Sequence, residues 1–564
     1  MPFNTHTHTK QQVKNNMTQT PKLLDFQETP ARRLAANIRA GQSTVLLGVV
    51  GSGKTYVACS AILDLLNSGD VAPADILDPE KVLFLMPTSC KIKFGRVATS
   101  WKLSNYAIHS YTEMNFKAGE LYVDWQTHGV KSVDVPATRD GVPVLDASGQ
   151  PVLIKTEKRV ELENKAPQWT EEYFPEVLFL DESHMCKNEE TIRTRILVEY
   201  IKCLHRGWKG CVVFCSGTPF SKLVETKAIT MACLRSTEDA WKTKVRRIAG
   251  SHIDLTRPSE AGSERYKAEL VANNAFIEIE GVKFAKRAFT KNKFIELDPE
   301  RQRIYNMAFE EYQKVRAARG SDPLVGVIAV LVAMNKFRQI AEMLRSNEMG
   351  DFAHDRAYGD PAKQRQIIIA SNFRQTLKSV RARLQAKGVP SGQIVELHGE
   401  LSATVKQANV DIFQAGGARF MLMTLKTGGV GLSLDHDGSH PDQLPREVIL
   451  PPTWSPIELT QGLGRAHRVL TKSTTRQWIM WCKDTIEDYV AAKVEKGLRS
   501  LKTLMTRKVS WMSCYEQVEE STVPGDKEIE EMLFADTVEE EDGEQETFED
   551  DIFDNMVEEE AVTA

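Results

Sequence analysis

The chain has 564 residues, 41% of them hydrophobic and 26% charged, which is typical of a globular protein with two to four domains. The longest apolar run, residues 324–334, is about half the length that spans a bilayer, so we expect no membrane association. The formal net charge of −5 is uneven: residues 516–564 hold 21 acidic residues and one lysine, which leaves +15 on the remainder and favours a polyanionic partner.

Residues 1–22 are polar and are expected to be disordered. They hold no apolar leader, so we expect a cytoplasmic protein of a bacterium or a virus-infected cell. The nine cysteines form no CxxC pair, which favours reduced, mostly buried thiols over metal ligands or disulfides.

Residues 23–223 alternate short apolar runs with helix-like stretches, which predicts a parallel sheet flanked by helices. The predicted strands are Thr44–Val49, Val82–Met86, Val177–Leu180 and Cys211–Cys215. Residues from about 117 to 170 interrupt the alternation. We interpret them as an insertion containing a β-hairpin, with Ser148-Gly149 near its turn.

A phosphate-binding loop lies between the first predicted strand and a helical stretch. Residues 48–55 read GVVGSGKT and match G-x-x-x-x-G-K-T in the context that this motif requires. Gly51 and Gly53 would let backbone N–H groups close around phosphates without Cβ clashes, and Gly48 and Ser52 are expected to bind the nucleotide from the same loop. Lys54 would reach the β- and γ-phosphates, and the Thr55 hydroxyl would ligate Mg²⁺. The sequence thus predicts an ATP site that uses Mg²⁺.

Upstream of this loop, Gln27 precedes Thr29-Pro30 and a predicted helix. A glutamine amide pairs one acceptor with one donor, as the adenine edge does, so Gln27 is either an adenine contact or an ordinary surface residue.

A pair of carboxylates follows the third predicted strand, in VLFLDESH at residues 177–184. Ligands of open α/β sheets bind at the carboxyl ends of the strands, where this pair is placed. Asp181 is suited to hold Mg²⁺, and Glu182 to orient and deprotonate the attacking water. His184 would connect this site to the face that binds nucleic acid.

The second half of the chain is predicted to contain a helical insertion and another α/β lobe. Residues 224–360 read as mainly helical and basic, and residues 361–505 as the second lobe. Its predicted strands are Gln366–Ala370, Ile394–Leu397, Phe420–Thr424, Val448–Leu450 and Ile479–Cys482. In QGLGRAHR at 461–468, Arg465 and Arg468 would share one helix face, from which arginines could stabilise charge on a transferring phosphoryl group.

In this order, the motifs resemble superfamily two helicases, and most closely their Swi/Snf-like branch. The resemblance covers residues 23–500 and rests on the phosphate loop and DESH together with several further signatures. These are HSYTEM (109–114), Lys187-Asn188, SGTP (216–219), FIELDPERQRIY (294–305), MNKFRQIAEML (334–344), ELHGELSA (396–403), LKTGGVGLSL (425–434) and TWSP (453–456). The sequence departs from the family in having GSGKT for GLGKT and Val469-Leu470 after the last arginine, which indicates a divergent, phage or viral member.

The resemblance implies an α/β fold of two RecA-like lobes with parallel sheets, a helical insertion between them and a disordered acidic tail. It further implies that Ser216 and Thr218 couple ATP hydrolysis to DNA, and that Gly429, Gly431 and Gln461 complete the site from the second lobe. Phosphate contacts are expected near Thr88, Tyr111, Lys426 and Thr427. The motor interpretation requires Arg465 and Arg468 to lie near Lys54.

We therefore expect an ATP hydrolase of the DNA helicase or translocase type, active on duplex or branched DNA. No zinc-finger, homeodomain or RNA-recognition motif occurs, so no sequence specificity is expected. An RNA helicase and a scaffold that does not hydrolyse ATP remain alternatives. The acidic tail, residues 515–564, either solubilises the chain, competes with DNA for the basic body or docks on a partner protein. The oligomeric state is left open.

Overall fold

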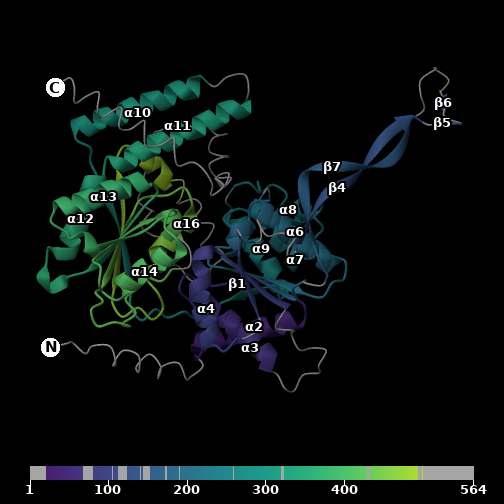
Figure 1. Ribbon diagram of the computed structural model, residues 1–564, viewed down its shortest axis with the longest axis horizontal. Coiled ribbons are helices and arrows are strands. Elements are labelled where there is room, and N and C mark those ends of the chain that lie inside the picture. Colours follow the sequence, from purple (N-terminus) through teal and green to yellow (C-terminus); the bar gives the residue numbers. More distant parts are fainter. Residues whose placement is uncertain are drawn as a thin grey trace, which may run out of the picture.

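The computed structural model contains two α/β lobes that lie side by side (Figure 1), which confirms the expected fold class. The expected disordered start and the acidic tail lie almost wholly outside the described residues. The structure describes residues 21–67, 81–103, 106–111, 113, 123–136, 138–139, 142–143, 153–171, 174–189, 191–257, 259–318, 323–428, 432–492, 494 and 498.

Lobe 1 is built on a six-stranded parallel sheet whose four central strands are buried on both faces. Such strands read as continuous apolar runs, which is why four of them were recognisable in the sequence. In spatial order they are β10 (Phe276–Glu278), β1 (Thr44–Leu47), β9 (Cys211–Ser216), β8 (Val177–Asp181), β2 (Val82–Met86) and β3 (Ala107–Ser110).

Lobe 1 extends further along the chain than the expected boundary at residue 223. Strand β10 pairs in parallel with β1, with Val45 opposite Phe276, so residues 224–278 belong to this lobe and not to an insertion. The helices of the lobe are α2 (Asp25–Arg39), α3 (Lys54–Asn67), α4 (Lys91–Ser100), α6 (Ile192–His205), α7 (Lys227–Cys233), α8 (Trp241–Ala249) and α9 (Glu260–Ala272), with short 3-10 turns at η3 (Thr88–Cys90), η4 (Ser183–Cys186) and η5 (Leu223–Thr226).

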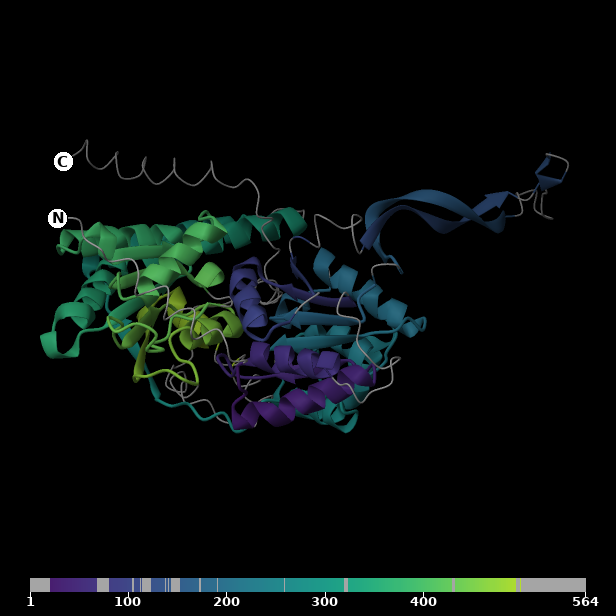
Figure 2. The ribbon, with the colours of Figure 1, turned by 60° about the horizontal axis from the view of Figure 1, so that its bottom comes forward.

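The insertion in lobe 1 is a long antiparallel hairpin that projects away from both lobes (Figures 1 and 2). It is formed by β4 (Val123–Pro136) and β7 (Leu153–Trp169), with β5 (Thr138–Arg139) and β6 (Val142–Pro143) beyond them. Trp169 anchors its base: the ring is 2% exposed, donates to the carbonyl of Ile196 at 2.9 Å and packs against Tyr200. The turn expected at Ser148-Gly149 lies outside the described residues.

Lobe 2 contains a second six-stranded parallel sheet, which begins at residue 288 and not at 361. Its order is β11 (Ala288–Ile295), β16 (Thr475–Cys482), β15 (Arg446–Leu450), β12 (Gln366–Ser371), β14 (Phe420–Thr424) and β13 (Ile394–Leu397). Its helices are α12 (Ser346–Tyr358), α13 (Arg374–Ala386), α14 (Ala403–Gln414), α15 (Leu425–Gly428) and α16 (Pro456–Gly464), with turns η6 (Pro361–Lys363) and η7 (Ser391–Gln393).

The helical insertion is shorter than expected and lies within lobe 2, not between the lobes. It consists of α10 (Pro299–Ala317) and α11 (Pro323–Met343), which pack along each other over one side of the lobe (Figure 1). Tyr305, Tyr312 and Phe337 form a core between these helices. Ile486 and Tyr489 from the end of lobe 2 complete it, so the insertion is fixed to this lobe.

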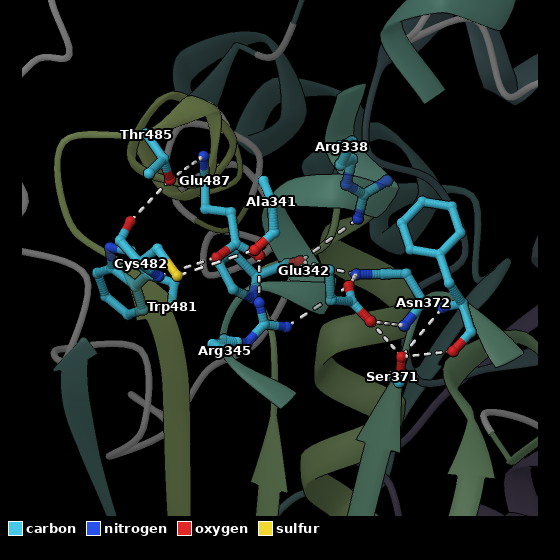
Figure 3. A network of polar contacts seen from close by, with 12 residues as sticks. Arg338, Ala341, Glu342, Arg345, Ser371, Asn372, Trp481, Cys482, Thr485 and Glu487 are labelled. Carbon is cyan, nitrogen blue, oxygen red and sulfur yellow. Dashed lines mark hydrogen bonds and ion pairs between the residues drawn. The ribbon is translucent and has the colours of Figure 1, made fainter. Parts of the chain in front are cut away.

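A buried ionic network joins α11 to the second sheet (Figure 3). Arg345, which is 0% exposed, forms ion pairs with Glu342 and Glu487. Glu342 accepts hydrogen bonds from the backbone N–H and the side-chain amide of Asn372, at 3.0 and 2.7 Å. Glu487 accepts from the backbone N–H of Cys482 at the end of β16. The network therefore connects the insertion to the ends of β12 and β16.

No described helix of this chain is long and apolar enough to cross a membrane. The eight described cysteines are all buried and unbridged, as their lack of CxxC spacing predicted.

Candidate ATP site between the lobes

The phosphate-binding loop joins the end of β1 to the start of α3 at Lys54. Gly51 and Gly53 have φ angles of 84° and 85°, a region that side chains other than glycine rarely adopt. A Cβ atom on Gly51 would lie 2.5 Å from Cδ of Arg468, and one on Gly53 would lie 2.2 Å from Nε2 of Gln27. Glycine is thus required here both by the turn and by the close approach of two other segments.

Gln27 lies against this loop and is not a surface residue. It is 5% exposed, and its Nε2 donates to the carbonyl of Ser52 at 2.7 Å while its Oε1 accepts from the backbone N–H of Leu24 at 3.0 Å. Of the two alternatives for Gln27, the surface residue is therefore wrong. The adenine contact stays a prediction.

Lys54 and its neighbours occupy the start of α3. The Nζ of Lys54 donates to the carbonyl of Gly48 at 3.0 Å, so the ammonium group lies across the loop. Thr55 follows it in the first turn, and the buried Ser52 hydroxyl has no hydrogen-bond partner within the described part of the chain. The positive end of α3 and the lysine together favour an anion at this loop.

The carboxylate pair lies at the end of β8, at the same edge of the sheet as the loop. Burial and the neighbouring Glu182 raise the pKa of Asp181. Burial also disfavours the charged form of Glu182, but the positive charges of Lys54, His184, Arg465 and Arg468 lower its pKa on balance. Glu182 therefore stays ionised at neutral pH, as a base that accepts a proton from water must be.

The backbone of Glu182 is strained, with φ 55° and ψ 52° in the left-handed region. For a residue other than glycine this costs about 1–2 kcal/mol, and such strain is concentrated at functional sites. The hydroxyl of Tyr111 donates to the carbonyl of Asp181 at 2.9 Å and so helps to fix the backbone that leads into Glu182.

His184, Ser216 and Thr218 form a chain of contacts that starts at Glu182. Nδ1 of His184 lies 3.5 Å from Oε2 of Glu182 and 3.3 Å from the hydroxyl of Ser216. That hydroxyl accepts from the backbone N–H of Thr218 at 3.0 Å. The ends of β8 and β9 are thus joined by side chains, which is an arrangement able to transmit a shift from one strand end to the other. Their coupling role stays a prediction.

Lobe 2 completes the site with Gln461, Arg465 and Arg468. Nε2 of Gln461 lies 3.4 Å from both Oε2 of Glu182 and Nε2 of His184. Arg465 is 1% exposed, and its Nη1 donates to the carbonyl of Leu432 at 3.1 Å; Nη2 of Arg468 donates to the same carbonyl at 2.6 Å. The positive charges of Lys54, Arg465 and Arg468 all lower the pKa of Glu182, so the two arginines lie in the same site as Lys54.

The guanidinium groups of Arg465 and Arg468 use only some of their N–H donors in hydrogen bonds with the described residues. Nε and Nη2 of Arg465 and Nε of Arg468 are buried without a hydrogen-bond partner in the described residues. Burial lowers the pKa of Arg465 to about 10, and the positive charge of Arg468 adds to this effect. Unpaired buried cations are costly, so this cluster fits a bound polyanion such as the phosphates of a nucleotide.

Mg²⁺ also fits this site in chemical terms. Thr55 and Asp181 provide the hydroxyl and carboxylate oxygens that Mg²⁺ takes in addition to phosphate oxygens and water. The described residues contain no cluster of three or more His, Cys, Asp or Glu side chains that would hold a metal without a nucleotide.

Other predicted residues lie elsewhere. Tyr111 is 2% exposed beneath Asp181, so the expectation that it contacts nucleic acid is wrong. Thr88 and Lys426 are exposed and stay candidates for phosphate contact. The side chain of Thr427, and Gly429 and Gly431 entirely, lie outside the described residues.

Comparison with known proteins identifies a family match within the second lobe. Residues 336–470 match the family model described as the helicase conserved C-terminal domain. The chain is 23% identical over 377 residues to the SNF2 domain-containing protein ENL1 of Oryza sativa, a match that covers 56% of this chain and 36% of that protein. It is 30% identical over 146 residues to the "Probable global transactivator" of Orgyia pseudotsugata multicapsid polyhedrosis virus, covering 25% of this chain and 27% of the relative.

Among solved structures, the SWI2/SNF2 ATPase core of Sulfolobus solfataricus in complex with dsDNA aligns with 87% of this chain and 98% of that chain, at 15% identity and a TM-score of 0.31. The chain spans about a quarter to a third of the length of the curated relatives named above. These matches confirm the resemblance to the Swi/Snf-like branch of superfamily two, including its viral relatives.

Proposed function

We propose that this protein hydrolyses ATP between its two lobes and uses that hydrolysis to move on nucleic acid, with duplex or branched DNA as the preferred track. The observation that carries the proposal is the placement of two buried arginines of lobe 2 in this site: Arg468 lies against Gly51 of the phosphate loop, and Arg465 acts on the charge of Glu182. Both keep N–H groups without a partner among the described residues. Because these groups come from different lobes, ATP turnover would depend on closure of the cleft.

Each side chain has a distinct part in this proposal. Lys54 would bind the β- and γ-phosphates, and Thr55 and Asp181 would hold Mg²⁺, which neutralises phosphate charge when bound. Glu182 would orient the attacking water and accept its proton. Arg465 and Arg468 would stabilise charge on the phosphoryl oxygens. Gln461 and His184, in contact with Glu182, would hold it in place.

Duplex DNA is proposed on two grounds. The body of the chain outside the acidic tail carries +15, which suits phosphate contacts without base recognition. The motif set resembles the Swi/Snf-like branch, and the family resemblance implies translocation on DNA more than strand separation. An RNA helicase is the second candidate.

The deciding experiment measures ATP hydrolysis with duplex DNA, branched DNA, single-stranded DNA and RNA at low salt. We expect duplex or branched DNA to give the largest stimulation, and stimulation that falls steeply as salt rises. Stimulation by RNA alone would replace the proposal with the RNA helicase. No hydrolysis with any of the four would favour a scaffold that binds without turnover.

In the same assay, Glu182→Gln is expected to lower stimulated turnover by about 10²–10⁴-fold, the usual contribution of a general base. Glutamine keeps the size of the side chain but cannot accept the proton. DNA affinity in the presence of ATP should be retained, which separates loss of chemistry from loss of the site. A Glu182→Gln variant that hydrolyses ATP at the parental rate would contradict the assigned base.

A further inference from the structure

Among the described residues, helix α4 of lobe 1 contacts lobe 2 through the side chains of Lys93 and Arg96. Nζ of Lys93 donates to the hydroxyl of Ser433 at 2.7 Å. One turn further on, Nη1 of Arg96 lies 3.8 Å from Oδ1 of Asp411, but this pair is largely exposed and contributes little. Lys93 is therefore the contact of α4 that matters for the position of lobe 2.

The segment that Lys93 binds also holds both arginines of the candidate site. The carbonyl of Leu432, the residue before Ser433, accepts hydrogen bonds from Arg465 and from Arg468. The backbone N–H of Leu434, the residue after it, donates to the carbonyl of Arg465 at 3.0 Å. The segment 432–434 thus binds both arginines of lobe 2 and also contacts Lys93 of lobe 1.

We propose that Lys93 is a positioning residue for ATP hydrolysis: by bonding Ser433 it fastens the 432–434 segment to lobe 1, and so sets where Arg465 and Arg468 stand in the closed cleft. The inference rests on the proposed function. Lys93 would act through the arginines and would support turnover only while the lobes are closed.

The charges around Lys93 explain why closure would depend on a bound polyanion. Burial and the positive charge of Arg468 lower the pKa of Lys93 to about 7, while Asp435 opposes this effect. Closure therefore brings a further amine from lobe 1 towards two guanidinium groups of lobe 2. A nucleotide's phosphates would offset this repulsion, so the contact between Lys93 and Ser433 would form most readily with nucleotide present.

The test is a double-mutant cycle on Lys93→Ala and Ser433→Ala, measured as kcat and KM for ATP at saturating duplex DNA. Each single change is expected to lower kcat about 10-fold, the value of one charge-assisted hydrogen bond, with little change in KM. The double variant should be no slower than either single variant. Ser433→Thr keeps the hydroxyl and should stay within about two-fold of the parent.

Lys267→Ala is the matched control, because Lys267 is a half-buried lysine of lobe 1 whose ion pair with Glu278, at 2.9 Å, stays within that lobe. It should leave kcat unchanged. If Lys93→Ala does not fold, the comparison of Ser433→Ala with Ser433→Thr still decides, since equal rates for these two would overturn the inference. Unchanged kcat in Lys93→Ala, or additive losses in the cycle, would also overturn it. An inactive parent protein would instead overturn the proposed function, and this inference with it.

Discussion

Replacing Arg468 with alanine is expected to reduce DNA-stimulated ATP turnover by about 10³-fold or more, the contribution of an arginine that stabilises transferring phosphoryl charge. The backbone of Arg468 packs against the phosphate loop, since a Cβ on Gly51 would lie 3.1 Å from its Cα. Its buried Nε–H has no hydrogen-bond partner among the residues that the structure describes. Steady-state hydrolysis with duplex DNA measures the effect.

Arg468→Lys is the informative companion variant. Lysine keeps the charge but lacks the planar fork, so it should recover only a small part of the lost rate. Arg465→Ala should lose a similar amount, and the double variant should lose less than the product of the two, because both groups act on one site. A parental rate in Arg468→Ala would remove lobe 2 from the proposed chemistry.

Replacing Arg345 with alanine is expected to destabilise lobe 2 by about 3–5 kcal/mol, the usual cost of removing one partner from a buried ionic network. Arg345 forms ion pairs with Glu342 and Glu487, and its removal leaves these two buried carboxylates with only the more distant charge of Arg338 to offset theirs (Figure 3). Differential scanning calorimetry of the full chain measures the loss as a lower transition temperature for lobe 2.

The loss should depend on pH in a defined direction. Burial raises the pKa of Glu487 in the folded protein, and without Arg345 the pKa would rise further. A carboxyl group whose folded pKa is raised binds protons more tightly when folded, so acidification through that pKa favours the folded state. The difference between Arg345→Ala and the parent should therefore be smaller at pH 5 than at pH 7.

Arg301→Ala provides the control for this prediction. Arg301 lies in α10 and forms ion pairs with Asp298 and Glu348, but all three side chains are partly exposed. Its removal should cost less than about 1 kcal/mol. Equal losses in Arg301→Ala and Arg345→Ala would show that burial of the network is not the source of its stabilisation.

The central strands could be predicted because burial on both faces leaves a plain apolar signature. Gln366–Ser371 is buried along its whole length and Val177–Asp181 at all but its last residue, and their apolar runs are unbroken for four residues. Strand β11 was missed because it lies at a sheet edge: in AFTKNKFI only the last residue is buried, and polar side chains break the pattern. Missing β10 and β11 is what misplaced the boundaries of both lobes.

Some residues of the candidate site could likewise be predicted from the sequence, and others could not. The phosphate loop, the carboxylates and the arginines follow motifs whose chemistry is local in sequence, and the structure brings them together. Lys93 has no such signal, because its contact with Ser433 joins positions 340 residues apart. Tyr111 lies within a recognisable motif, but only the fold shows that its hydroxyl faces the carbonyl of Asp181 and not solvent.

The hairpin of lobe 1 amplifies any movement of that lobe. Its base is held by Trp169 in the core, whereas a strand of 14 residues extends about 46 Å beyond it. A rigid rotation of the lobe by about 10° would then carry the far end of the hairpin through about 8 Å. If the proposed function holds, a displacement of that size at the tip of this arm would equal about two base-pair steps of duplex DNA.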